Sequence, residues 1–431
     1  MILLIILILL VGEKHMLISL RINNYQIYNH EVEFSMKANM HIKHFLSSVY
    51  KEKKLNILKS AIIMGPNNAG KTCFIRGLRT MKHIMLNEDN IIQKNIFGDN
   101  EITEMEISFL RDEHEYSFSI KYDNKKKEYI YERFSEVFRD VHNNIKEDVL
   151  LLRDIENSVY ECKDQELVSV MKVAAKNNIL IYVFDTSDFP TLNRIKEAII
   201  AFASKVDIID MNNIPIKKTL ECMKTKSVMR EKIVSFIKNA DLSLDDYRYL
   251  NDDELEISLS SEEKPQELAL GNSKNILDLL HLTSIYNGIP VPSLFYDSTG
   301  TKKMAALASY VIEALEKGRI LVVDELDNSL HFKLTRAIIA MFNNDLNINA
   351  QLIATVHNTS LLDCQTLFRK DQIWFAHKDK VNAYLYSLAE FTSEKNKVRS
   401  NTDLIENYKR GVFGALPEPN LFDSLVDISR R

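Results

Sequence analysis

The sequence predicts an α/β phosphate-loop protein with an antiparallel β subdomain and a mostly helical insertion, and three observations support this. The segment IIMGPNNAGKT (62–72) runs from an apolar strand into the pattern G-x-x-x-x-G-K-[ST]. A second apolar strand, in RILVVDELDNSLH (319–331), ends in two carboxylates. Residues 17–36 and 101–134 alternate apolar and polar side chains, which is typical of half-buried antiparallel strands.

Length and composition limit the class of protein. The 431 residues suit two or three domains, or one large domain with insertions, and 45% apolar with 27% charged residues is ordinary for a soluble globular chain. A net charge of −5 disfavours nonspecific nucleic-acid binding by the whole surface, although a local basic patch is compatible with it. The four cysteines are far apart and form no C-x-x-C pair, so we expect neither a zinc site nor a disulfide framework, and a cytoplasmic location.

The apolar start MILLIILILLVG is too short to span a bilayer, and no basic segment precedes it. A pattern suited to a strand begins at Met16. We therefore expect residues 1–15 to be an upstream extension or the result of a mis-assigned start. A membrane anchor and a genuine buried strand are the alternatives.

The remaining elements follow from the periodicity of apolar residues. In chain order we expect two strands joined by a bend (17–36), a polar and basic stretch (41–59), the phosphate-loop strand and a helix to about residue 85, a meander (101–134), a helical segment (136–247), an acidic surface strand and loop (251–266) and a helix (273–286). The expected divisions are an extension (1–15), an N-terminal lobe (16–135), an insertion (136–290) and a C-terminal lobe (291–431).

The phosphate loop comprises Gly65, Pro66, Asn67, Asn68, Ala69, Gly70, Lys71 and Thr72. Glycines let the backbone turn tightly and present N–H groups to phosphate oxygens. Lys71 is expected to neutralise the β- and γ-phosphates, and the Thr72 hydroxyl to ligate Mg²⁺. The alternative is a strand–helix turn that holds no ligand, but the pattern's position between a strand and a helix favours a nucleotide site.

The second apolar strand supplies the carboxylates that a nucleotide site needs. Asp324 is expected to hold Mg²⁺ through water, and Glu325 to act as the general base on the attacking water. The alternative is an acidic loop after a core strand. Lys71 and Asp324 are 253 residues apart, so a large insertion separates the two halves of the site.

Two further segments flank this strand. Upstream, Ser298-Thr299-Gly300 opens a helix that ends at Lys317-Gly318, and Ser298 and Gly300 at its N-terminus provide a second anion site. Downstream, His357 ends another apolar strand, 33 residues after Asp324. Taken alone, His357 is more often structural, but in this order of motifs we expect it to contact a γ-phosphate.

The order of these parts resembles the ABC-type ATPase heads of the SMC and overcoming-lysogenization-defect (OLD) families. It resembles more closely bacterial abortive-infection AAA family ATPases of the AbiLi/RloA type, over most of the chain from Met16. In this resemblance GPNNAGKT is the Walker A motif, residues 298–300 are a reduced signature motif, and DELDNSLH combines Walker B and D-loop. His357 is the switch histidine. The opening strand pair is RINNYQIYNHEVEF, and the closing segment is residues 401–417.

The resemblance implies ATP and Mg²⁺ as cofactors, ATP hydrolysis, and a homodimer or higher oligomer with shared ATP sites. The signature departs from the fuller Leu-Ser-Gly-Gly-Gln form, and no Q-loop glutamine is evident. The strand start from Glu101 to Glu106 is the expected equivalent of the Q-loop.

The function that the resemblance implies is an ATP-driven switch in bacterial antiphage defence that controls a separate toxic effector, a nuclease or toxin. The alternatives are an SMC-like DNA repair or chromosome ATPase, and a nucleotide-binding scaffold with little hydrolysis. The insertion is too short and too interrupted for long coiled-coil arms. We expect no nuclease site in the chain itself, because Asp185 and Asp188 precede Pro190 as a turn would.

Overall fold

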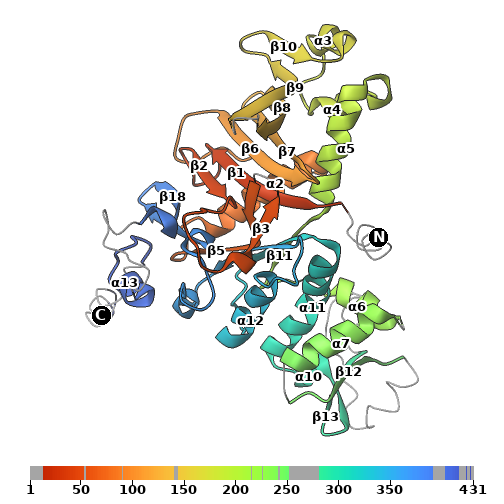
Figure 1. The fold of residues 1–431 in the computed structure, drawn as a ribbon, viewed down its shortest axis with the longest axis vertical. Coiled ribbons are helices and arrows are strands. Elements are labelled where there is room, and N and C mark those ends of the chain that lie inside the picture. Colours follow the sequence, from red (N-terminus) through yellow and green to blue (C-terminus); the bar gives the residue numbers. More distant parts are fainter. Residues whose placement is uncertain are drawn as a thin grey trace.

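The computed structural model describes residues 13–52, 55–89, 91–139, 144–214, 216–225, 227–240, 243–251, 281–391 and 403–416, and the single positions Ser424 and Ile428. Two large sheets lie one above the other, and a smaller lobe of helices and short strands lies below them in Figure 1. Most of the predicted extension (1–15) and of the predicted acidic segment (251–266) lies outside the described residues.

The core sheet holds the phosphate-loop strand at its centre. Its order is β11 (Val206–Asp210), β15 (Ile320–Asp324), β16 (Gln351–Val356), β5 (Ser60–Met64), β17 (Ile373–Asp379) and β18 (Asn382–Ser387). All neighbouring strands pair in parallel except β17 and β18, which are antiparallel. Both predicted apolar strands are confirmed, and they are apolar throughout because the parallel sheet is covered on both faces.

Successive residues of these strands enter two different cores. Ile63 of β5 and Val322 of β15 pack towards α2 (Lys71–Leu86), α5 (Pro190–Ser204) and the second sheet. Ile62 and Val323 pack towards α11 (Thr299–Lys317) and α12 (Phe332–Phe342) on the other face. The period of two along each strand therefore fixes which helices cover which face.

The second large sheet is antiparallel, in the order β10-β9-β8-β7-β6-β1-β2. Its strands are β1 (His15–Asn23), β2 (Val32–Ser35), β6 (Ile102–Arg111), β7 (His114–Asp123), β8 (Glu128–Arg139), β9 (Ile145–Asp154) and β10 (Val159–Cys162), and a separate two-stranded sheet joins β3 (Val49–Glu52) to β4 (Leu55–Leu58). The predicted strand pair and meander are confirmed. The loop between β1 and β2 is longer than a bend, and it brings Tyr28 to the phosphate loop.

The helical pattern expected over 136–247 is wrong wherever that segment forms strands. The meander continues through β9 and β10, and β11 belongs to the core sheet. Phe134 of β8 pairs opposite Leu151 of β9, and both are buried in the core, so sheet burial outweighs the local helix preference of the Lys, Glu and Leu residues. The helices of the segment are α3 (Gln165–Met171), α4 (Leu180–Val183), α5, α6 (Lys217–Lys224) and α7 (Val228–Ala240).

The small lobe packs against the second face of α11. It contains α6, α7, β12 (Asp246–Tyr249), β13 (Leu282–Tyr286), β14 (Ile289–Pro292) and α10 (Ser293–Tyr296). Met304, Leu307 and Val311 of α11 face the core sheet, whereas Ala305, Ala308 and Ile312 face α6 and α7. The predicted helix from Ser298 to Lys317 is confirmed, and Gly318 ends it with a positive φ of 59° and an N–H that donates to the Ala314 carbonyl.

The predicted helix over 273–286 is wrong for its described end, because Leu282–Tyr286 is a strand of a hairpin. The hairpin turns at Asn287 and Gly288, with φ angles of 50° and 78°. Asn-Gly is the preferred pair where both central residues have positive φ.

These features confirm the predicted fold class: an α/β phosphate-loop fold with an antiparallel β subdomain. The other elements among the described residues are α13 (Leu404–Lys409) and short 3₁₀ turns at Leu46–Ser48, Thr186–Asp188, Thr359–Leu361, Lys370–Gln372 and Leu388–Glu390. Within the described part of the chain, no helix combines the length and the apolar character that crossing a membrane demands.

Candidate functional site

The carboxyl ends of β5, β15 and β16 meet at one edge of the core sheet. β5 leads into the phosphate loop, β15 ends at Asp324 with Glu325 next, and β16 is followed by His357. Parallel strands place these ends together because all three run in the same direction. The structure therefore brings the loop, both carboxylates and the histidine to one edge, although they are far apart in the sequence.

The phosphate loop needs its glycines. A Cβ on Gly65, whose φ is 153°, would lie 2.2 Å from the carbonyl oxygen of Ala376. A Cβ on Gly70, whose φ is 110°, would lie 2.7 Å from the Tyr28 hydroxyl oxygen, and that hydroxyl donates to the Gly70 carbonyl at 3.0 Å. Asn68 also has a positive φ, of 64°. A backbone this tightly curved suits a cradle for phosphate oxygens.

Lys71 begins α2 and is buried, and its amine crosses the loop. Its Nζ donates to the Gly65 carbonyl at 2.7 Å and to the Pro66 carbonyl at 3.0 Å. Burial lowers the pKa of Lys71, while the negative charges of Asp324, Glu325 and Asp327 oppose that shift. The negative charges of these carboxylates therefore favour the protonated form of Lys71. Thr72 follows Lys71 in the first turn of α2.

Asp324 is held by a threonine of the neighbouring strand. The Thr355 hydroxyl donates to Asp324 Oδ1 at 2.5 Å and accepts from the Glu325 backbone N–H at 2.7 Å. Both Asp324 and Thr355 are buried. Among the described residues no hydrogen bond reaches the second carboxylate oxygen of Asp324. That oxygen fits the chemistry of a Mg²⁺ site, because Mg²⁺ takes oxygen ligands and is commonly bound by one or two carboxylates.

Glu325 has a left-handed backbone, with φ of 57°, and its carboxylate makes three contacts. Oε2 accepts from the side-chain amides of Asn212 at 2.9 Å and Asn328 at 3.1 Å, and Oε1 lies 3.7 Å from His357 Nε2. The hydrogen bond from Asn212 is the main cause of a lowered pKa for Glu325, helped by Asn328 and by the charges of His357 and Lys71. An ionised carboxylate beside the phosphate loop can accept a proton from water.

The loop DELDNSLH is tied to the end of β16. Asp327 Oδ2 accepts from the backbone N–H groups of His357 at 2.8 Å and Asn358 at 2.6 Å. Leu326 donates to the Thr355 carbonyl at 3.0 Å. These bonds fix the backbone that carries His357, whose side chain is 38% exposed.

Ser298 and Gly300 occupy a different part of the site. Ser298 caps α11 by accepting from the Thr301 N–H at 3.1 Å, and a Cβ on Gly300 would lie 3.0 Å from the Ser329 carbonyl oxygen. Lys303 donates to the Asn328 carbonyl and to the Ser329 hydroxyl, each at 3.3 Å. The start of α11 thus packs on the DELDNSLH loop, and no hydrogen bond among the described residues joins Ser298 or Gly300 to residues 65–72 of the same chain.

The sequence interpretation missed Asn212, Asn328 and Thr355. Asn212 follows β11. The sequence feature that could have placed Asn212 at a strand end is the strand-forming run VDIID, which ends at Asp210. The segment from Glu101 to Glu106, the expected equivalent of the Q-loop, enters β6 of the antiparallel sheet, where Glu101 pairs with Lys94 and Glu106 with Arg21. At this edge Asn212, not a residue of β6, contacts Glu325.

The predicted turn before Pro190 is confirmed. Asp185 accepts from the Ser187 backbone N–H at 3.0 Å, residues 186–188 form a 3₁₀ turn, and Pro190 begins α5. Within the part of the chain that the structure describes, no three His, Cys, Asp or Glu side chains are grouped to hold a metal ion.

Comparison with known proteins gives one family. Residues 60–363 match the family described as "AAA domain, putative AbiEii toxin, Type IV TA system". No curated protein matches the sequence. Among solved structures, the SMC head domain from Thermotoga maritima has 10% identity and a TM-score of 0.40, over 86% of this chain and 98% of that one. The Smc head domain from Pyrococcus furiosus, bound to the C-terminal domain of ScpA, has 12% identity and a TM-score of 0.40, over 92% and 100%.

Proposed function

Because the chain belongs to the family described as "AAA domain, putative AbiEii toxin, Type IV TA system", we propose that it binds and hydrolyses ATP to operate a bacterial antiphage defence switch. The observation that carries the proposal is the position of Glu325. Its carboxylate is held by two amides at the same sheet edge as the phosphate loop and Lys71.

In this proposal each residue has one task in hydrolysis. The loop N–H groups of residues 65–72 and Lys71 bind the phosphates. Thr72 and Asp324 would hold Mg²⁺, which would supply positive charge to neutralise the phosphate oxygens. Glu325 accepts a proton from the attacking water, and His357 contacts the γ-phosphate. The Thr355 hydroxyl fixes the positions of Asp324 and Glu325 relative to each other, because it forms a hydrogen bond with each of them.

The proposed active form is a homodimer or higher oligomer in which Ser298 and Gly300 of one subunit complete the ATP site of the other. Within one chain these residues bond locally to Thr301 and pack against Ser329. The start of a 19-residue helix favours an anion at that point. ATP would then join two heads, and hydrolysis would release them.

The proposed output of this cycle is control of a separate effector protein, a toxin or nuclease. The family description, which names a putative toxin and a toxin–antitoxin system, supports a role in this kind of defence. A head that pairs and separates with its nucleotide state can hold or release another protein by changing shape.

Phage challenge of cells that express the chain with its neighbouring genes tests the defence role. We expect the wild type to reduce plaque formation, and Lys71→Ala and Glu325→Gln to abolish that protection. Lys172→Ala and Glu166→Gln, both at exposed positions of the α3 region, are the matched controls and should protect. Protection that persists in both site variants would contradict an ATP-driven switch, and no protection by the wild type against a broad phage panel would contradict the defence role.

A further inference from the structure

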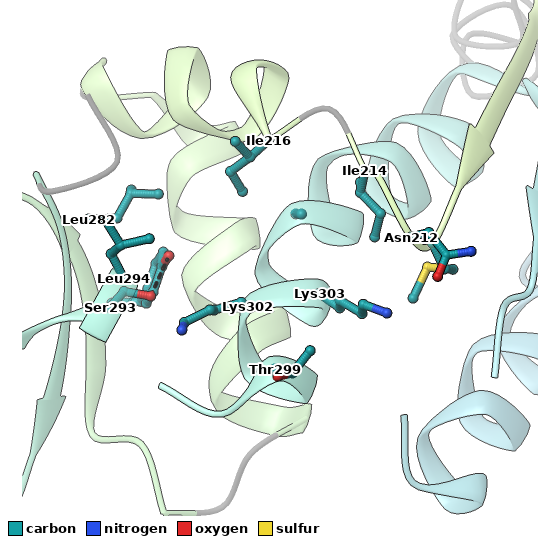
Figure 2. A pocket seen from close by; sticks show the side chains of 12 residues that line it. Asn212, Ile214, Ile216, Leu282, Ser293, Leu294, Thr299, Lys302 and Lys303 are labelled. Atoms are coloured by element: carbon teal, nitrogen blue, oxygen red, sulfur yellow. Dashed lines mark hydrogen bonds between the residues drawn. The ribbon is translucent and has the colours of Figure 1, made fainter. Parts of the chain in front are cut away.

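A cavity of about 200 Å³ lies between α11, the segment after β11, the paired strands β12 and β13, and α10 (Figure 2). Ile214, Ile216, Leu282 and Leu294 provide an apolar wall. The cavity is smaller than the roughly 300–1,000 Å³ typical of sites for drug-sized ligands, so it suits a short molecule.

Among the described residues that line the cavity, the polar side chains have partners except the amine of Lys302 and the hydroxyl of Thr299, and Lys302 is the cation among these two. Tyr247 donates to the Ser293 hydroxyl at 3.3 Å, and Ser293 donates to Asp297 at 2.5 Å, so these hydroxyls have partners. The side-chain amine of Lys302 makes no hydrogen bond or ion pair with any described residue, and Figure 2 shows this amine directed across the cavity towards Ser293. No Asp or Glu is among the residues that line the cavity.

We propose that this cavity binds a small amphipathic anion, a carboxylate with a short apolar chain. The carboxylate pairs with the Lys302 amine, and the chain packs among Ile214, Ile216 and Leu294. An unpaired cation beside an apolar wall favours a ligand with one charged end and one apolar end, because each end then replaces its contacts with water.

The cavity shares one wall with the catalytic edge. Asn212 lines the cavity, and the same side-chain amide donates to Glu325 Oε2. A ligand packed against Met211 and Ile214 would restrict the movement of the segment that carries this amide, and with it the movement of the Glu325 carboxylate. Bound ligand should therefore slow ATP turnover, and this step rests on the proposed function.

Binding is tested first without nucleotide, by isothermal titration calorimetry of the full chain with sodium octanoate. We expect saturable binding to the wild type, retention in Lys302→Arg, and at least tenfold weaker binding in Lys302→Ala, which loses a charge-assisted contact. Leu294→Trp, which fills the cavity from a half-buried position, should abolish binding, and Lys172→Ala should bind like the wild type. Neutral 1-octanol should bind at least tenfold more weakly than octanoate.

The absence of saturable binding, wild-type affinity in Lys302→Ala or Leu294→Trp, or equal affinity for octanol would overturn the site. The regulatory step is tested separately by ATP turnover in saturating octanoate. We expect turnover to fall in the wild type and to be unchanged in Asn212→Ala, which should still bind octanoate. Inhibition of both proteins to the same extent would overturn the coupling through Asn212. The calorimetric result does not depend on whether the protein hydrolyses ATP.

Discussion

The side-chain amide of Asn212 donates to Oε2 of Glu325 at 2.9 Å, and this bond joins the segment after β11 to the carboxylate after β15. Asn328 strengthens the contact, since its amide donates to Glu325 at 3.1 Å and to the Asn212 side-chain oxygen at 2.6 Å. The proposed general base is therefore held by residues that come from both halves of the chain.

Asn212→Ala should raise the pKa of Glu325, because it removes the main cause of the lowered pKa. A base with a higher pKa becomes protonated at higher pH, so the acidic limb of the pH–rate profile should move to higher pH. Steady-state ATPase assays across pH measure this shift. Asn213→Ala is the control, since Asn213 is the exposed neighbour, and an unchanged limb in Asn212→Ala would argue against Glu325 as the titrating group.

Thr355→Val should lower the free energy of unfolding by about 1–3 kcal/mol, since the buried Asp324 carboxylate and the Glu325 N–H each lose a hydrogen-bond partner. The substitution keeps the shape of the side chain but removes its hydroxyl. Urea denaturation followed by circular dichroism measures the change. Thr359→Val, in the turn that follows β16, is the control and should stay within about 0.5 kcal/mol of the wild type.

Gly65→Ala should reduce both thermal stability and ATP binding, because its Cβ would lie 2.2 Å from the Ala376 carbonyl oxygen. Gly288→Ala is the matched control: Gly288 also has a positive φ, but a Cβ there meets nothing within 4 Å. Both variants carry backbone strain, and the Gly65 variant alone carries a clash. Melting curves with and without ATP compare them, and an equal loss in the two variants would contradict the assigned role of the loop geometry.

Mixing Lys71→Ala and Ser298→Arg subunits tests the shared ATP site. Each variant alone should be inactive. In a mixed dimer one site carries both lesions and the other carries neither, so about half of the wild-type activity per mixed dimer should return on this two-site geometry. If mixing restores no activity although size-exclusion chromatography shows mixed dimers, each chain completes its own site.

The parts predicted well are those whose signal is local. The phosphate loop between β5 and α2, the two carboxylates at the end of β15 and the N-terminal cap of α11 are each encoded within about 20 residues by glycines, apolar runs or a capping serine. The Asn287-Gly288 pair is an equally local sign of a turn, and the prediction of a helix over 273–286 did not take it into account.

The parts predicted poorly depend on contacts between distant segments. β11 is a strand because Ile208 pairs opposite Val322, and no short window of sequence contains both partners. Asn212 could not be assigned to the site until β11 was placed beside β15. The left-handed backbone of Glu325 has the same origin, since the N–H of Glu325 bonds to Thr355 on the neighbouring strand.

ATP turnover and ATP binding by Glu325→Gln, measured side by side, test the central claim most directly. Glutamine keeps the size of the side chain but removes the proton acceptor, so turnover should fall by about 10²–10⁴-fold while ATP still binds. Lys71→Ala should lose binding itself, and Glu166→Gln should match the wild type in both assays. Hydrolysis by Glu325→Gln at the wild-type rate would contradict the assignment of Glu325 as the base, and with it the proposed site at the edge of the core sheet.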